Sequence, residues 1–455
     1  MINSIIKLRI FKTPFFIFSP FLVFSVIWTL VCSDSIMDGD ASKYLHFAQN
    51  MLHGFYSPPA PNINLSVGPG YPLLIIPFVA FNLPLQSIVL LNSVFYYLSI
   101  VILYKTLFFV IKKQNALIVS LFWGFYYNLF DSMNNILPET IAPFLFSIFL
   151  YFLFKAHFSN NGKLKRYLFF AGITLGYIAL TKIIFGYVIL FLLAGSGFLL
   201  LFNRKSVNYR SGLLVSIVAL LTLAPYLLYT YQLTGKVFYL GTTAGNNMYW
   251  MSTPHEKEYG SWFPEPKPIK DSISLQEKKS VDAFRQMEYN GIMTDDQNIP
   301  GTDDYIRRNH LNNFKNILKL SGDKQDDALK QIAFKNIKEH PMKFIENIFS
   351  NMGRMLFNFP YSYKLQKPAT LLRIPHNGII AALVLLCLFP TLLNWKQIIY
   401  PIRFSVFICC MYFGASLTGS AESRMFSVIV PILLVWISIV LESTVNIKWK
   451  FQKNE

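Results

Sequence analysis

Residues 14–40 read PFFIFSPFLVFSVIWTLVCSDSIMDGD, an apolar run of 20 residues followed by three aspartates. An α-helix needs about 20 apolar residues to cross the ~30 Å hydrocarbon core of a bilayer. Runs of similar character occupy residues 88–111 and 425–445. Only 14% of all residues are charged, whereas soluble domains average about 25%. The sequence therefore predicts an all-α polytopic membrane protein.

The distribution of positive charge predicts how the chain is oriented. Lys7, Arg9 and Lys12 precede the first apolar run, and most positive charges outside residues 233–374 lie in short clusters between such runs. Short cytoplasmic loops are enriched in Lys and Arg, so we expect the N-terminus inside and the acidic loop 34–40 outside. The net charge of +17 is divided among these loops, which argues against a nucleic-acid-binding face. All four cysteines lie in apolar runs, and their spacing indicates no metal site or disulfide framework.

The alternation of apolar runs and charged loops predicts about ten spans with both termini inside. Residues 41–54 form an amphipathic pattern expected to lie on the membrane surface. Residues 71–81 are apolar but too short to cross, so a re-entrant or interfacial position is expected. The ten predicted spans are 14–33, 85–111, 116–133, 137–157, 167–182, 184–202, 212–232, 377–394, 404–418 and 425–445.

The composition divides the chain into three parts. A charged segment at residues 233–374, with helical patterns such as 323–350, predicts an outer-side soluble insertion that is mixed or mostly helical. Residues 1–232 form the predicted N-terminal membrane module, whose acidic first outer loop is 34–70. Residues 375–455 supply the C-terminal spans.

Charged residues near the outer membrane surface form the candidate site, because charges near hydrocarbon tend to mark functional positions. A carboxylate there could accept a proton from an acceptor hydroxyl, and a cation could hold a phosphate. Simpler interpretations remain open: Asp40 could be a helix N-cap, Lys182 could extend toward the interface, and Arg424 could form a surface ion pair with Glu422. The candidates are Asp38, Asp40, Glu139, Lys182, Arg354, Glu422 and Arg424.

Several short motifs follow one another in a recognisable order. Asp40 lies four residues before Tyr44, and the predicted surface helix ends at Gly54. With six further elements, this order resembles GT-C glycosyltransferases, and more narrowly the protein O-mannosyltransferase and lipid A aminoarabinose transferase group. The further elements are Gly70-Tyr71-Pro72-Leu73-Leu74, Leu137-Pro138-Glu139-Thr140, a span containing Ala171-Gly172, Gly176 and Leu180-Thr181-Lys182, the stretch Asn246-Asn247-Met248-Tyr249-Trp250, Lys338-Glu339-His340-Pro341 with Arg354, and Glu422-Ser423-Arg424-Met425-Phe426.

The resemblance implies a GT-C fold and the inverting transfer of a sugar from a polyprenyl-phosphate donor on the outer face. The acceptor would be a glycan, a lipid or a protein. The resemblance also implies a general base in the acidic loop; the spacing to Tyr44 favours Asp40, with Asp38 as the alternative. Two residues would position the acceptor: Glu139 and Tyr71. Three would hold the donor phosphate: Lys182, Arg354 and Arg424.

The sequence departs from the aminoarabinose transferases in two places. Their second element begins with Lys-Pro-Pro, whereas this chain has Gly68-Pro69-Gly70, so one phosphate contact must come from elsewhere or be absent. The acidic pair is Asp38-Gly39-Asp40 and not Asp-Glu. No metal ligands are predicted and no cofactor is certain, although a divalent cation could be required.

Two other classes of protein compete with a glycosyltransferase. A polysaccharide polymerase or ligase would share the span count and the large outer loop. A transporter of lipid-linked glycans would need polar groups deep in its spans, whereas these spans are almost purely apolar. Neither GxGxxG nor GxxxxGK[ST] occurs, which argues against a soluble nucleotide donor. The expected location is the bacterial cytoplasmic (inner) membrane, with the active site on the periplasmic side.

Overall fold

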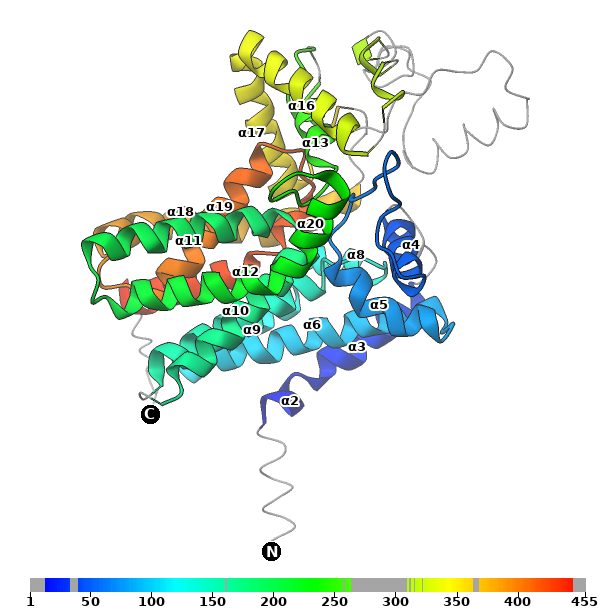
Figure 1. Ribbon diagram of the computed structural model, residues 1–455. Helices are drawn as coiled ribbons and strands as arrows, with labels where there is room; N and C mark the ends of the chain where they lie inside the picture. Colours follow the sequence, from blue (N-terminus) through cyan, green and yellow to red (C-terminus); the bar gives the residue numbers. More distant parts are fainter. Residues whose placement is uncertain are drawn as a thin grey trace, which may run out of the picture.

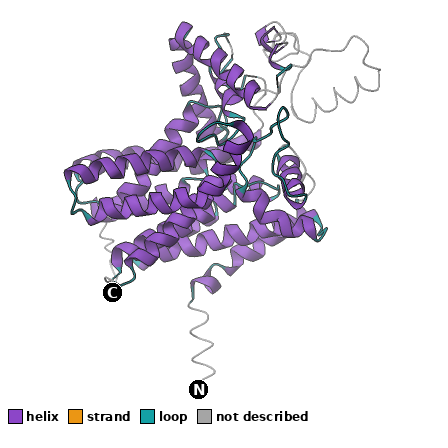
Figure 2. Ribbon diagram, viewed as in Figure 1, coloured by secondary structure: helices purple, strands orange, loops and turns teal. Residues whose placement is uncertain are grey.

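The structure is a computed structural model of the chain, and every regular element of the described residues is a helix (Figures 1 and 2). This confirms the predicted all-α fold class. The described residues are 13–32, 40–159, 162–256, 258–262, 309–310, 312–314, 316–320, 322–362 and 368–444. The helices up to residue 251 are α2 (Pro14–Ile17), α3 (Ser19–Val31), α4 (Ala41–Leu52), α5 (Gly70–Ala80), α6 (Leu85–Leu107), α7 (Lys113–Gly124), α8 (Asn128–Met133), α9 (Ile141–Phe158), α10 (Leu164–Thr181), α11 (Ile184–Phe202), α12 (Val207–Thr234) and α13 (Ala244–Met251). Those that follow are α16 (Gly322–Glu339), α17 (Pro341–Phe357), η2 (Pro368–Arg373), α18 (Ile374–Leu393), α19 (Tyr400–Leu417), α20 (Ser423–Phe426) and α21 (Val430–Thr444).

The core of the helical body is built from α6, α9, α10 and α12, which pack in that order. Two glycines explain how closely α10 approaches α12. A Cβ added to Gly172 would lie 2.6 Å from Cβ of Val218, and one added to Gly176 would lie 2.5 Å from Cβ of Thr222. Small residues four positions apart let helix backbones approach closely in membrane proteins. A side chain at either position would therefore separate the two helices.

In the described part of the chain, six helices are long and apolar enough to cross a membrane: α6, α9, α11, α12, the stretch Leu371–Leu393 that includes α18, and α19. The predicted count of ten is not confirmed. The predicted span 116–133 is divided between α7 and α8, and the predicted span 425–445 is divided between α20 and α21. The predicted span 14–33 is likewise interrupted between α2 and α3. Apolar composition predicts the total length of an apolar segment, but it does not show where the helix within that segment is interrupted.

The two short segments before α6 are helical, which confirms the helix predicted at residues 41–54. α4 has one buried face that includes Tyr44, Phe47 and Ala48, and it packs against α5. It is followed by Gly54, whose φ of +86° is readily adopted only by glycine. α5 has only 11 residues, fewer than a membrane crossing needs, and its re-entrant or interfacial position stays a prediction.

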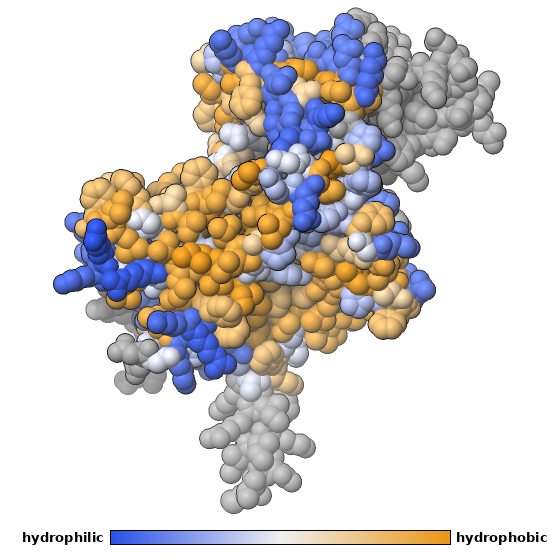
Figure 3. All heavy atoms as spheres, in the orientation of Figure 1, coloured by the Kyte–Doolittle hydropathy of each residue, from blue (hydrophilic) through white to orange (hydrophobic). Residues whose placement is uncertain are grey.

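The described part of the predicted insertion is helical and has a small core of its own. α13 packs against α16, and Tyr249 and Trp250 contact Phe314 there. The helical pattern predicted for 323–350 is two helices, because α16 ends at Glu339 and α17 begins at Pro341, whose ring cannot continue a helix. In Figure 3, hydrophilic residues gather over α16 and α17, and hydrophobic residues cover much of the helical body. The predicted division into three parts, with its two boundaries, stays a prediction.

Candidate active site

Five of the seven candidate charged residues lie in one cluster, which we call the Asp40 cluster: Asp40, Glu139, Lys182, Glu422 and Arg424. They come from the start of α4, the loop before α9, the end of α10 and the short helix α20. Residues 384 positions apart in the chain are thus brought into direct contact. The fold therefore assembles carboxylates and cations at the ends of several helices.

Asp40 occupies the N-cap position of α4, but its side chain makes no capping hydrogen bond. Its two carboxylate oxygens instead accept from cations: Oδ1 from Nζ of Lys43 at 2.8 Å, and Oδ2 from Nη2 of Arg424 at 2.6 Å. An aspartate needed only as a cap would direct an oxygen to a backbone N–H in the first turn. The structure thus favours a role for Asp40 other than capping.

Arg424 lies at the centre of the Asp40 cluster. Besides its contact with Asp40, its Nε is 3.0 Å from Oε2 of Glu422 and 3.8 Å from Oε1 of Glu139. The predicted surface pair with Glu422 exists, but it is only one of three carboxylate contacts. About a quarter of the Arg424 side chain remains accessible, at 26%. A guanidinium group in this position can exchange one anionic partner for another without leaving the site.

Glu139 and Lys182 form a largely buried ion pair. Nζ of Lys182 is 2.7 Å from Oε1 of Glu139, whose side chain is only 2% exposed. Among the described residues, Oε2 of Glu139 has no hydrogen-bond partner. Lys182 directly follows α10, where the backbone turns extended at φ −127° and ψ 95°. Its ammonium group is thus used in the cluster and does not extend toward the interface.

A buried asparagine, which sequence reasoning missed, holds the loop that carries Glu139. Nδ2 of Asn92 donates to the carbonyl oxygen of Asn135 at 2.8 Å, and Oδ1 of Asn92 accepts from the Thr140 hydroxyl at 2.9 Å. Asn92 lies in the middle of an apolar run on α6, and a polar residue inside a predicted span was the available signal. The asparagine fixes the residues on both sides of Glu139.

Tyr71, the second predicted acceptor-positioning residue, lies close to the cluster but is buried. Its ring meets that of Tyr44 edge-on, with 5.2 Å between centroids. α5 begins against the end of α10, since a Cβ on Gly70 would lie 2.6 Å from Oγ1 of Thr181. Glycine at this position therefore allows the element with Tyr71 to contact the element with Lys182.

The charges around Asp40 control its pKa. Burial by itself would raise the pKa of this carboxyl group, but the guanidinium of Arg424 and the ammonium of Lys43 outweigh that effect. The net result holds the pKa of Asp40 well below its usual range. Asp40 is therefore ionised at any physiological pH while Arg424 stays bound to it.

Arg354 is not part of the Asp40 cluster, contrary to what its predicted role in phosphate binding requires. Its guanidinium is fully buried and donates to the carbonyl oxygens of Tyr259 at 2.6 Å, Pro360 at 3.1 Å and Ala421 at 3.4 Å. It also donates to Oδ1 of Asn351 at 2.8 Å. All three of its nitrogens are thus engaged with protein oxygens, so Arg354 ties α17 to the loop that leads into α20.

Asp38, the alternative base, lies outside the described residues, as does Asp34.

The charges around Asp40 also decide whether a metal ion fits there. Both carboxylate oxygens of Asp40 are bonded to cations, and Arg424 lies between Asp40 and Glu139. A protein cation thus occupies the position that a divalent ion bridging these two carboxylates would need. The described part of the cluster does not fit a metal ion between them.

Comparison with family models finds one match, which covers part of the chain. Residues 68–229 match the family model described as dolichyl-phosphate-mannose-protein mannosyltransferase. This match confirms the resemblance to GT-C glycosyltransferases that the sequence motifs indicated. It covers the predicted elements with Tyr71, Glu139 and Lys182. No protein with a curated description matches the chain.

Solved structures of similar architecture include an oligosaccharyltransferase of Archaeoglobus fulgidus tethered to an acceptor peptide, with 14% identity and a TM-score of 0.47 over 95% of this chain and 50% of that one. The Archaeoglobus fulgidus oligosaccharyltransferase AglB with an inhibitory peptide and a dolichol phosphate gives 13% identity, 94% and 50% coverage, and a TM-score of 0.46. ArnT of Cupriavidus metallidurans bound to undecaprenyl phosphate gives 12% identity, 93% and 77% coverage, and a TM-score of 0.39. The chain thus spans about half the length of the two oligosaccharyltransferase chains.

Proposed function

We propose that this chain is a GT-C glycosyltransferase that moves a sugar from a polyprenyl-phosphate donor to an acceptor hydroxyl group. The family match over residues 68–229 supports the reaction class. One structural observation carries the assignment of the site: the Asp40 carboxylate caps no helix and is held at 2.6 Å by an arginine that also faces Glu139 and Glu422. Carboxylates and an accessible guanidinium in one place suit proton abstraction beside a phosphate leaving group.

The proposed reaction is a single displacement with inversion at the anomeric carbon. The acceptor oxygen forms a bond to that carbon on the face opposite the phosphate, and its proton passes to Asp40. The bond between the anomeric carbon and the phosphate oxygen breaks, and its electron pair leaves with the polyprenyl phosphate. The leaving group gains negative charge, so the site needs cations more than it needs a general acid.

Arg424 would make the base and the leaving group depend on one another. A carboxylate whose pKa is far below its usual range is a weak base, and Arg424 is the stronger of the two charges that lower the pKa of Asp40. When the donor phosphate binds Arg424, it weakens the contact with Asp40. The pKa of Asp40 then rises, and Asp40 becomes a better base only once the donor is in place.

The other members of the cluster receive complementary roles. Lys182 is held by Glu139 at 2.7 Å and would supply the second positive charge near the phosphate. Glu139 has one carboxylate oxygen without a hydrogen bond in the described region, and that oxygen could orient an acceptor hydroxyl. Tyr71 would shape the acceptor side. We assign Arg354 a positioning role through the loop that carries Arg424, in place of the predicted phosphate contact.

The proposal includes the face of the membrane on which transfer occurs. Exposed basic residues mark the opposite ends of the helices, including Lys113, Lys163, Arg204 and Lys205. By the positive-inside rule those ends would be cytoplasmic, which favours transfer on the outer face of a bacterial cytoplasmic membrane. The charged cluster lies at helix ends and not at mid-span, which fits chemistry at the interface better than transport.

Replacement of the proposed base tests the mechanism. Asp40→Asn should lower the rate of transfer by ~10²–10⁴-fold, since the amide cannot accept the acceptor proton. Membranes carrying each variant would be compared for transfer of labelled sugar from the native polyprenyl-phosphate pool to the envelope fraction. Asp38→Asn serves as the matched control. Near-normal transfer by Asp40→Asn with loss in Asp38→Asn would contradict the residue assignment, and activity in both variants would contradict the mechanism.

A further inference from the structure

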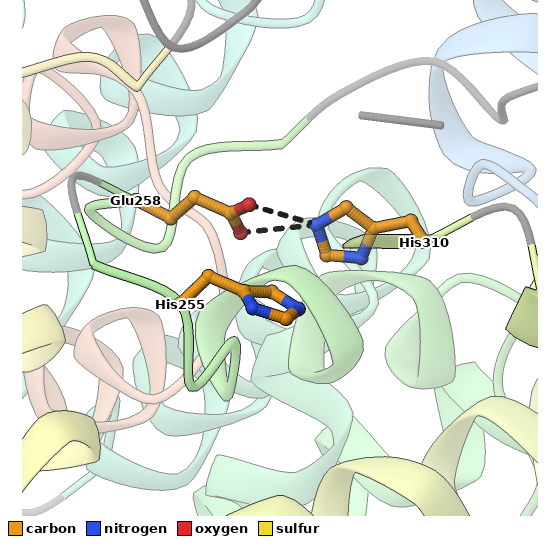
Figure 4. Close-up of side chains that lie close together, drawn as sticks. All are labelled: His255, Glu258 and His310. Carbon is orange, nitrogen blue, oxygen red and sulfur yellow. Dashed lines mark hydrogen bonds and ion pairs between the residues drawn. The ribbon is translucent and has the colours of Figure 1, made fainter. Parts of the chain in front are cut away.

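A second cluster of ligand-type side chains lies outside the Asp40 cluster, in the part of the chain that follows α13. His255, Glu258 and His310 each place one donor atom within 4.8 Å of the other two, and Figure 4 shows the three side chains facing one another. His255 and Glu258 belong to one loop, whereas His310 lies more than 50 residues further along the chain. The fold thus brings together residues that no short sequence motif joins.

The cluster is built into the interior of this part of the structure. The side chain of Glu258 is 0% exposed and that of His310 is 2% exposed. Nε2 of His310 lies 3.0 and 3.1 Å from the two carboxylate oxygens of Glu258. The carboxylate also accepts hydrogen bonds from the Thr253 hydroxyl and, at 3.1 Å, from Nδ2 of Asn309. Three side chains, those of His310, Thr253 and Asn309, therefore hold the Glu258 carboxylate in one orientation.

The surroundings of His310 resemble the support that metal-binding histidines usually have. Its second ring nitrogen, Nδ1, lies 2.7 Å from the hydroxyl oxygen of Tyr249, which also accepts a hydrogen bond from Asn313 at 3.1 Å. In metal sites the non-ligating nitrogen of a histidine is regularly hydrogen-bonded, and this contact fixes the ring. Tyr249 can thus hold the ring so that Nε2 faces Glu258.

We propose that His255, Glu258 and His310 bind one divalent transition-metal ion, with Zn²⁺ as the best match. Two imidazoles and one carboxylate are a known zinc ligand set, whereas Mg²⁺ and Ca²⁺ prefer oxygen ligands alone. Three protein ligands leave a fourth position for water or another small ligand. Two ligand atoms of a tetrahedral zinc site, each at about 2.0–2.1 Å from the metal, lie roughly 3.3 Å apart. Nε2 of His310 and Oε1 of Glu258 are 3.0 Å apart, so these two atoms need to move little to bind one ion.

His255 distinguishes a metal site from a simple buried ion pair. A pair of Glu258 and His310 needs no third ligand, yet the His255 ring meets the His310 ring with 5.2 Å between centroids. His255 is only partly buried and lies in a loop, so it can turn toward the other two residues. Metal binding would replace the direct contact between Nε2 of His310 and the Glu258 carboxylate by a bond from each of these groups to the ion.

The proposed metal site lies in a loop that is linked to the Asp40 cluster through Arg354. Tyr259 follows Glu258 directly, and its carbonyl oxygen accepts from Arg354 at 2.6 Å. Arg354 in turn donates to the carbonyl oxygen of Ala421, three residues before Arg424. Metal binding would thus stabilise the loop on which Arg354 depends. This consequence rests on the proposed function, but the existence of the metal site does not.

Metal binding to the full-length chain in detergent tests the proposal without any assay of transfer. The protein would carry a purification tag without histidines, be stripped with a chelator, and be titrated with Zn²⁺ and separately with Mg²⁺ by calorimetry. We expect one equivalent of Zn²⁺ per chain and no saturable binding of Mg²⁺. The absence of saturable Zn²⁺ binding would overturn the proposal. Binding of Mg²⁺ with the same stoichiometry and affinity as Zn²⁺ would also overturn it.

Variants assign the binding to these residues. His255→Ala removes a partly exposed ligand and is expected to fold; it should abolish the single Zn²⁺ equivalent, whereas the exposed His53→Ala should retain it. Tyr249→Phe removes only the supporting hydroxyl and should weaken zinc binding by about 10–100-fold. The visible spectrum of bound Co²⁺ should show tetrahedral bands that His255→Ala lacks. Full zinc binding by His255→Ala would show that these residues do not form the site.

Discussion

Arg424 and Arg354 offer a comparison between two regions that the sequence alone treats alike. Both arginines were predicted to bind the donor phosphate. Arg424 faces the side-chain carboxylates of Asp40, Glu139 and Glu422 and keeps 26% of its side chain accessible. Arg354 is fully buried, and three of its partners are backbone carbonyl oxygens.

Only Arg424 has partners that a bound anion could replace. A phosphate can replace a carboxylate, because both are anions that accept from the same guanidinium fork. It cannot replace backbone carbonyls without unfolding the loop that they belong to, because buried polar groups left without partners destabilise a fold. We therefore assign phosphate binding to the region around Arg424 and loop anchoring to the region around Arg354.

The largest expected effect concerns the anchoring region. Arg354→Met should lower the free energy of unfolding by on the order of 3–5 kcal/mol, since several buried acceptors lose their donor at once. The midpoint of denaturant unfolding in detergent would measure this loss. Lys396→Met, at an exposed basic position, is the matched control and should change little. An Arg354→Met protein of unchanged stability would remove the distinction between the two arginines.

The next largest effect concerns the phosphate-binding region. Arg424→Gln should reduce kcat/KM for transfer by about 10²–10³-fold, as is usual when a donor to developing negative charge is removed. Its stability should change far less than that of Arg354→Met, because Arg424 is partly accessible and pairs only with side chains. Arg210→Gln, at an exposed arginine outside the cluster, controls for loss of charge. Full transfer activity in Arg424→Gln would contradict the assignment.

A smaller effect is expected in the pH dependence of transfer. Transfer requires Asp40 in its ionised form, and Arg424 and Lys43 lower its pKa against the opposing effect of burial. Loss of Arg424 leaves burial less opposed, so the pKa of Asp40 rises and the acid limb of the pH–rate profile moves to higher pH. The residual activity of Arg424→Gln, measured across the acidic range, checks this direction. An acid limb that stays in place or moves to lower pH would contradict it.

The smallest effect should come from Lys43. Its side chain is 48% exposed, and its charge lowers the pKa of Asp40 less than that of Arg424 does. Exposed ion pairs contribute about 0–1 kcal/mol. Lys43→Gln should therefore move the acid limb in the same direction as Arg424→Gln but less far. A larger shift from Lys43→Gln would make Lys43 the residue that controls the base.

Topology explains why the sequence could predict the Asp40 cluster but not the anchoring region. Counting alternating spans placed Asp40, Glu139, Lys182 and Arg424 on one face, because charges at span ends are visible in the sequence. The number of spans was less predictable, since breaks such as the one between α20 and α21 interrupt apolar runs without changing their composition. Fold class followed from the same composition.

Two other features depend on contacts that no sequence pattern encodes. The partners of Arg354 are mainly backbone carbonyls, which every residue possesses, so only the folded loop selects Tyr259 and Ala421. The ligands of the proposed metal site are split between residues 255–258 and His310, and the His-x-x-Glu spacing within the first group is a weak signal. Distant residues gathered by loops are the part of a site that local patterns predict least.

The most direct test of the account is a cryo-electron microscopy map of the full-length chain in lipid nanodiscs with undecaprenyl phosphate. We expect the phosphate to bind the guanidinium of Arg424 and Arg424 to move away from Asp40, while Arg354 keeps its carbonyl partners. A phosphate bound at Arg354, or one bound elsewhere while Arg424 stays 2.6 Å from Asp40, would contradict it.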